Sequence, residues 1–163
     1  MSGRSAWVAG NGQGLTWGAA INSADMASMS NNQSVVSGVA DIANGTNLDQ
    51  FMDLSFSLVI ASSTIVAGAN VAFWIFELNQ DGTTYGDGQF TNGTAASKTP
   101  TFPPCAVFPL VAAAAQTTLV GACMGIIIPP GSFRIAMQNN SGFSLTSGTQ
   151  TVKYRTYNQN LNS

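Results

Sequence analysis

The chain has 163 residues, of which only 7% are charged, and its formal net charge is −2; in an ordinary soluble domain about 25% of the residues are charged. A chain of this length is expected to form one domain whose core needs no metal or disulfide. Its five Lys and Arg residues are too few and too scattered to attract a nucleic acid. Histidine, the most common general base and transition-metal ligand, is absent, so we expect no enzyme activity, no metal and no cofactor.

The N-terminal 21 residues are rich in glycine and show no hydrophobic periodicity. Such a segment cannot build a core of its own, yet it contains four large apolar side chains: Trp7, Leu15, Trp17 and Ile21. We expect residues 1–21 to form an extended arm that contacts a neighbouring subunit through these side chains, and residues 22–163 to form the folded domain. The alternative is that the tryptophans fold back onto their own domain. The segment lacks the apolar run of a signal peptide.

From residue 34 onward the pattern is that of β-strands, after one short helical turn expected behind Asn22. Alternation of apolar and other residues is clearest at 51–60, where Met52, Leu54, Phe56, Leu58 and Ile60 share one face. Further strands are expected at 34–40, 71–78, 105–111, 118–127, 133–138, 143–145 and 151–157. These eight strands and the turn signals between them predict an all-β fold, a single eight-stranded antiparallel β-sandwich and most simply a jelly roll.

The strand expected at 71–78 is apolar on both faces. Val71, Phe73 and Ile75 share one face, and Ala72, Trp74 and Phe76 share the other. Either the strand is central in its sheet or its second face meets a partner. We expect Trp74 and Phe76 to contribute to a subunit contact in a homodimer or homotrimer.

Residues 110–128 carry no charge and are numerous enough to span a membrane. Polar residues at 116–118 and flanking prolines at 109, 129 and 130 instead favour two strands joined by a turn near 113–116, so we expect no membrane insertion. The two cysteines, Cys105 and Cys123, lie in apolar stretches. Two buried reduced thiols are the favoured interpretation, and a disulfide between them remains open.

Four aspartates are candidates for acid–base chemistry or calcium binding: Asp49, Asp53, Asp81 and Asp87. The loop that contains the last two lacks the oxygen spacing and closing glutamate of a calcium-binding EF-hand loop. We interpret all four as solvated turn residues. A hydrolase is disfavoured because the chain has no Gly-x-Ser-x-Gly motif and no histidine that would activate a hydroxyl.

Residues 49–161 resemble the jelly-roll capsid decoration, or cement, proteins of tailed bacteriophages. The likeness lies in the order and spacing of several short motifs: Asn47-Leu48-Asp49, the stretch 67–71 before an aromatic strand, the loop 81–88, and the stretches 107–110, 128–133, 139–142 and 153–158. The resemblance implies a non-enzymatic virion protein, made in the bacterial cytoplasm, that lies on the outer capsid surface, binds the major capsid protein and usually forms oligomers.

A second function remains open at this point, a carbohydrate-binding jelly-roll adhesin or fibre module. Surface aromatic residues such as Trp74 and Tyr85 would stack on sugar rings, with Asn and Asp as polar partners.

Overall fold

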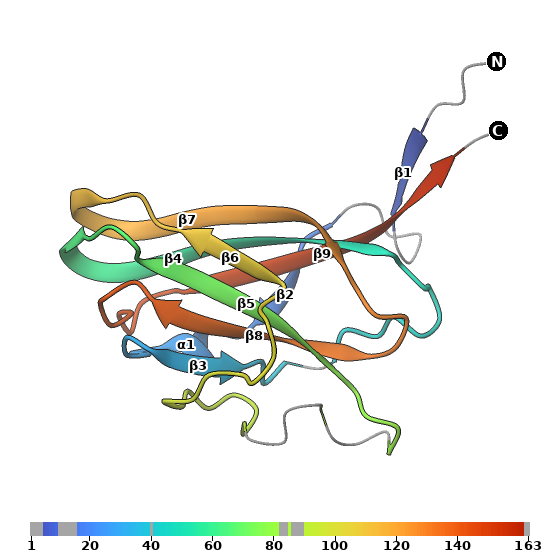
Figure 1. Ribbon diagram of the computed structural model, residues 1–163, viewed down its shortest axis with the longest axis horizontal. Helices are drawn as coiled ribbons and strands as arrows, with labels where there is room; N and C mark the ends of the chain where they lie inside the picture. The colour runs from blue at the N-terminus through green and yellow to red at the C-terminus, as the bar shows by residue number, and fades with distance from the viewer. Residues whose placement is uncertain (1–4, 10–15, 40, 82–84, 86–89, 162–163) are drawn as a thin grey trace.

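The computed structural model describes residues 5–9, 16–39, 41–81, 85 and 90–161. These residues form two antiparallel β-sheets that pack face to face, with one short helix, α1 (Ser23–Met26), beside them (Figure 1). The first sheet consists of β1 (Ser5–Ala9), β2 (Gly18–Ile21), β4 (Phe51–Ile65), β7 (Ala113–Ile127) and β9 (Thr151–Leu161). The second consists of β3 (Gln33–Val36), β5 (Asn70–Glu77), β6 (Ala106–Pro109) and β8 (Phe133–Asn140). The expected all-β sandwich is confirmed.

The strand pairing is nested along the chain. β5 pairs with β6, β4 with β7, β3 with β8 and β2 with β9, all antiparallel. The chain is therefore folded as one long hairpin that wraps around the core. Along each half of the hairpin, from β2 to β5 and from β6 to β9, successive strands alternate between the two sheets. The additional pairs β4–β9 and β5–β8 close each sheet. This nesting is the topology of a jelly roll.

The core lies between the sheets, and the alternation in the sequence explains which side chains fill it. All five residues that were expected on one face of β4 are buried: Met52, Leu54, Phe56, Leu58 and Ile60. From the opposite sheet, Val71, Phe73, Phe133 and Ile135 are buried against them. Phe56 packs with its ring centroid 5.7 Å from that of Phe73, so the two sheets meet through aromatic contact.

The described residues form nine strands rather than the expected eight. β1 and β2 lie in the segment assigned to the arm, and both pair with β9. Leu145 forms only an isolated bridge with Ile60, so the strand expected at 143–145 is absent. The proposed boundary at residues 21 and 22 is also wrong, because Ala20 and Ile21 are buried in the core of the sandwich.

The segment suspected of spanning a membrane contributes mainly β7, which begins at Ala113 instead of turning there. Ala115 has a positive φ of 54°, which marks the irregular start of this strand. Among the described residues, no helix is both long enough and apolar enough to cross a membrane.

The outer face of β5 is covered by the chain itself. The loop between β5 and β6 folds back over it, and Trp74 and Phe76 are almost fully buried there. The Trp74 indole N–H donates to the carbonyl of Phe102 at 2.8 Å, and the Phe76 ring lies 5.3 Å from the Phe102 ring and 5.7 Å from the Phe90 ring. The expectation that Trp74 and Phe76 contact another subunit is therefore wrong, because this loop occupies the place assigned to the partner.

Both cysteines are free thiols. Cys105 is exposed and Cys123 is partly buried, so the expectation that both thiols are buried is wrong. The Cys105 thiol donates to the carbonyl oxygen of Phe73 at 3.3 Å, and desolvation of the sulfur raises its pKa to about 12. Burial also raises the pKa of Cys123. Neither thiol is therefore activated as a nucleophile at neutral pH.

Candidate attachment surface

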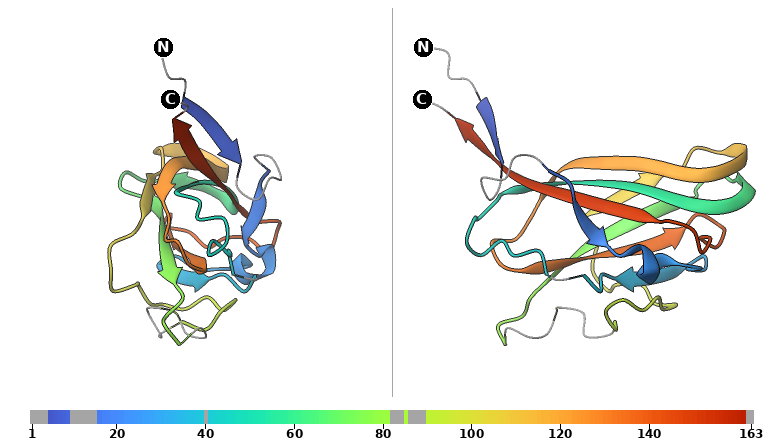
Figure 2. Two further views of the ribbon diagram at one scale, coloured as in Figure 1. Left: turned by 90° about the vertical axis from the view of Figure 1, so that its right-hand side faces the viewer. Right: turned by 180° about the vertical axis from the view of Figure 1, so that it is seen from behind.

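A two-stranded ribbon extends from one end of the sandwich. β4 pairs with β9 only as far as Tyr157, whereas β1 pairs with β9 from Tyr157 to Leu161. Beyond Tyr157, β9 therefore has β1 as its one strand partner among the described strands. Figures 1 and 2 show β1 and the end of β9 leaving the sandwich together, side by side.

An ion pair between the partly exposed Arg155 and the buried Asp53 fixes the base of this ribbon to β4. Asp53 is almost fully buried, and one of its carboxylate oxygens accepts hydrogen bonds from Arg155 Nε at 2.9 Å and Nη2 at 2.8 Å. The other oxygen accepts from the Tyr157 hydroxyl at 2.9 Å and from the backbone N–H of Gly125 at 3.0 Å. The carboxylate is thus fully hydrogen-bonded by β7 and β9, as a buried charge requires.

Aromatic contacts extend this cluster on both sides. The Arg155 guanidinium lies 4.8 Å from the ring centroid of Trp17, and the Tyr157 ring stacks on Phe51 with centroids 5.8 Å apart. Burial raises the pKa of Tyr157, and its hydrogen bond to Asp53 raises it further. The phenol therefore remains protonated and continues to donate to the carboxylate throughout the neutral range.

Asn158 makes the last connection before the ribbon leaves the sandwich. Its amide oxygen accepts from the backbone N–H of Gln50 at 2.9 Å, and its amide nitrogen donates to Asp49 at 3.0 Å. Asp49 and Asp53 are buried and hydrogen-bonded, so the interpretation of these two as solvated turn residues is wrong. Asp81 is exposed, and Asp87 lies outside the described residues.

The expected contact residues of the arm divide into three groups. Ile21 is only 2% exposed and belongs to the core, so its expected role as a partner contact is wrong. Trp17 is 37% exposed and packs on Arg155 of its own sheet. The backbone of Trp7 pairs with Gln159, its side chain lies outside the described set, and Leu15 lies outside the described residues altogether.

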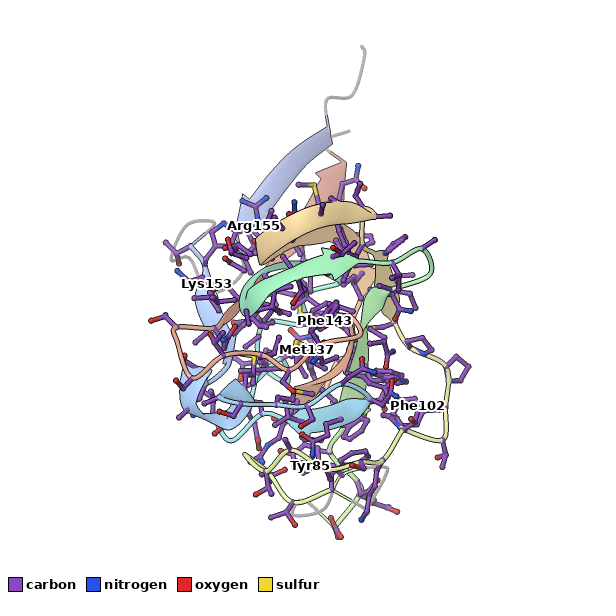
Figure 3. All side chains as sticks on the ribbon, turned by 90° about the vertical axis from the view of Figure 1, so that its left-hand side faces the viewer. Tyr85, Phe102, Met137, Phe143, Lys153 and Arg155 are labelled. Carbon is purple, nitrogen blue, oxygen red and sulfur yellow. The ribbon has the colours of Figure 1, made fainter. Side chains whose placement is uncertain are left out.

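The aromatic residues considered for sugar binding are not presented to solvent in the expected way. Trp74 is buried, and Arg134 covers one face of the Tyr85 ring, with its guanidinium carbon 4.8 Å from the ring centroid. Arg134 also forms an ion pair with Asp41 at 2.6 Å, which holds the guanidinium in place. Figure 3 shows Tyr85 and Phe102 in the loop outside one sheet, on the far side of the molecule from Arg155.

No group of three or more potential metal-ligating side chains occurs within the described part of the chain. No family model, no curated protein and no solved structure matches this chain.

Sequence reasoning missed the cluster at the base of the ribbon. Its one signal was the spacing of Lys153, Arg155 and Tyr157, which alternation places on the same face of a strand. The opposing carboxylate was not identifiable, because Asp53 precedes Arg155 by 102 residues and meets it only through the β4–β9 register.

Proposed function

We propose that this chain is a structural virion protein that binds the outer surface of a bacteriophage capsid and stabilises the shell by bridging neighbouring major capsid subunits. The observation that carries the proposal is the projecting β1–β9 ribbon. It supports an attachment role because it lies outside a sandwich whose large buried side chains are already packed by the chain itself.

The ribbon has the properties of a strand-addition element. Two strands alone are only marginally stable in water, because neither strand has a second partner. A ribbon gains stability when a strand of another protein pairs with its open edge, and the main-chain hydrogen bonds of that pairing supply affinity. β1 has no second strand partner among the described strands, and β9 has none beside β1 after Tyr157.

The cluster at the ribbon's base supports the same role. A clamp between two shell subunits transmits load only if the attachment element is held firmly by its own domain. The fully hydrogen-bonded Asp53, its ion pair with Arg155 and the stacked Phe51 and Tyr157 rings join the ribbon to the central strand β4. A displacement of the ribbon is therefore resisted by the sandwich as a whole.

The test is co-sedimentation of the purified chain with capsids that lack it. We compare the full chain with a variant that lacks residues 1–9, which loses β1 but keeps β2 and the buried Ala20 and Ile21. We expect this truncated variant to melt like the full chain and to bind capsids at least about tenfold more weakly, a loss of about 1.4 kcal/mol.

Two point variants test whether capsid binding depends on the pairing of β1 with β9 or only on the presence of residues 1–9. Val8 is opposite Asn158 in the ladder. Val8→Pro removes a backbone N–H and is poorly tolerated in a paired strand, whereas Val8→Thr keeps strand propensity. Weaker capsid binding by Val8→Pro but not by Val8→Thr supports the proposal. Equal binding by the full chain, the truncated chain and both point variants overturns the attachment role of the ribbon.

Carbohydrate binding receives no comparable support, because Trp74 is buried and one face of Tyr85 is covered. Specific, saturable binding on a glycan array, together with no binding to capsids, would favour that function instead.

A further inference from the structure

β7 is a long edge strand that carries no charged residue. It lies at the end of its sheet, with β4 as its only strand partner in the described part of the chain. The charge-free stretch is longer than the strand, because no Asp, Glu, Lys or Arg occurs between Lys98 and Arg134. Unpaired backbone groups along an edge are a template for pairing with another strand, and charged side chains are the usual protection.

The other sheet edges in the described structure are short or covered. β6 has four residues and ends in Pro109, which has no N–H to donate. The edge of β3 is covered by the loop between β5 and β6, where Ser34 and Ala96 exchange two backbone hydrogen bonds of 2.8 Å. β2 has four residues. β7, with 15 residues, is therefore the long edge that lacks these protections.

Large apolar side chains gather along this edge. Val120 is 65% exposed, Met124 is 72% exposed and Ile127 is 77% exposed, although all three lie within β7. A groove of about 270 Å³ lies beside Val120, between β6 and β7, and is lined mainly by apolar side chains that include Phe108, Leu110 and Val120. An apolar patch of this kind on a folded domain marks an interaction surface.

We propose that the β7 edge binds a second copy of the same chain, with the two β7 strands antiparallel across a twofold axis. The middle of the strand pairs with β4 without interruption from Thr118 to Cys123, so it is straight enough to accept a partner. Irregular pairing on both sides of this stretch, with positive φ at Ala115 and Gly125, limits the length of the contact. A twofold contact uses the same surface twice and forms a closed dimer instead of a fibre.

Charge and area favour a second copy as the occupant. Because the edge has no charge, two copies meet without repulsion, and the surface offers no charge with which to select a different partner. The exposed apolar residues Val111, Val120, Met124 and Ile127 offer roughly 500 Å² per copy, so a twofold contact that covers them buries about 1,000 Å², the least area expected of a specific interface.

The test measures the mass of the purified chain by light scattering at high micromolar concentration, without capsids. We expect a dimer of 16.8 kDa chains. Val120→Lys and Met124→Lys each place a charge at the edge and are expected to raise the dimer dissociation constant about 100-fold. Both side chains are largely exposed, so each variant should unfold at the same temperature as the wild-type chain when both are diluted enough to be monomeric. Asn92→Lys adds the same charge at an exposed site in the loop that covers β3, and should leave the dimer intact.

Hydrogen exchange of the backbone amides identifies the contact directly. We expect the amides of residues 118–123 to exchange more slowly in the wild-type dimer than in Val120→Lys. The proposal is overturned by a monomeric wild-type chain, by a trimer, or by a dimer that both lysine variants and the exchange rates leave unchanged. A monomer whose capsid binding is lost in Val120→Lys would assign the edge to the capsid instead. The dimer assay contains no capsids. A negative result in it therefore does not bear on the proposed attachment function, which the co-sedimentation experiment tests separately.

Discussion

Buried amide side chains connect the described loops of this protein to its sheets, among them Asn44, Asn139 and Gln150. The Gln150 side chain accepts from the backbone N–H of Val59 at 2.7 Å and donates to the carbonyl of Thr146 at 3.0 Å. Asn44 similarly spans the backbone of Asp49 and Pro129. In a chain with so few charges, neutral amides therefore supply the buried polar contacts that fix loop conformation.

We predict that Asn139→Ala lowers the free energy of unfolding by about 2–4 kcal/mol, because several buried backbone groups lose their partner together. The Asn139 amide nitrogen donates to the carbonyl of Phe143 at 2.7 Å, and its amide oxygen accepts from the N–H of Ser141 at 3.2 Å. Denaturant unfolding measures the loss. Asn92→Ala, at an exposed position, is the control and should change stability by less than about 0.5 kcal/mol. Equal stability of the two variants would contradict the structural role of Asn139.

We predict that the protein loses stability at alkaline pH, because the pKa values of its three tyrosines are raised in the folded state. Burial raises the pKa of Tyr85, Tyr154 and Tyr157 above the ordinary value of 10.0. Ionisation is then easier in the unfolded chain than in the folded one. Their contribution to stability is complete below pH 10 and is lost as the pH rises through the folded-state pKa values. Absorbance titration of the phenolates, followed together with circular dichroism, should give an ionisation midpoint above pH 10 and concurrent unfolding. An ionisation midpoint below pH 10 in the folded protein would contradict the prediction.

At the scale of single elements, β7 and β6 fit together because one residue has no side chain. A Cβ atom at Gly121 would lie 2.5 Å from the Phe108 ring and 2.7 Å from the Phe56 ring. Phe56 and Phe108 themselves form an edge-to-face pair with centroids 5.0 Å apart. The glycine therefore lets two aromatic rings close the side of the sandwich between its two edge strands.

Gly121→Ala is expected to destabilise the protein by about 1–3 kcal/mol through overpacking. Gly45→Ala is the matched control, because a Cβ at Gly45 would contact nothing within 4 Å. Thermal unfolding of the two variants measures the difference. A Gly121→Ala variant as stable as Gly45→Ala would show that the rings move aside at no cost.

The strands that could be predicted from the sequence are those in which apolar and other residues alternate along the strand itself. β4 was recognisable because alternation along its first ten residues selects the buried face. β1 and β2 have no such pattern and become strands only by pairing with β9, more than 130 residues away. The cover over β5 was equally hidden, because Phe90 and Phe102 lie in a loop without periodicity. The position of β7 at an edge depends on the order of strands, which local sequence does not specify.

At the scale of the whole molecule, the structure places two different surfaces on one sandwich. The β1–β9 ribbon leaves one end of the molecule, whereas the β7 edge runs along a side, at the opposite end of the strand order β1-β9-β4-β7 (Figure 1). The proposed attachment and the proposed self-association therefore do not compete for the same strand. A dimer formed through β7 would present two ribbons and bind two sites on a shell at once, which increases avidity without any new contact.

Electron cryomicroscopy of capsids decorated with the full chain tests the central claim most directly. The account predicts density for the jelly roll on the outer surface of the shell, with the β1–β9 ribbon in contact with the major capsid protein at the junction of neighbouring subunits. Density in which the ribbon points into solvent while another face of the sandwich contacts the shell, or particles that remain undecorated at saturating protein, would contradict it.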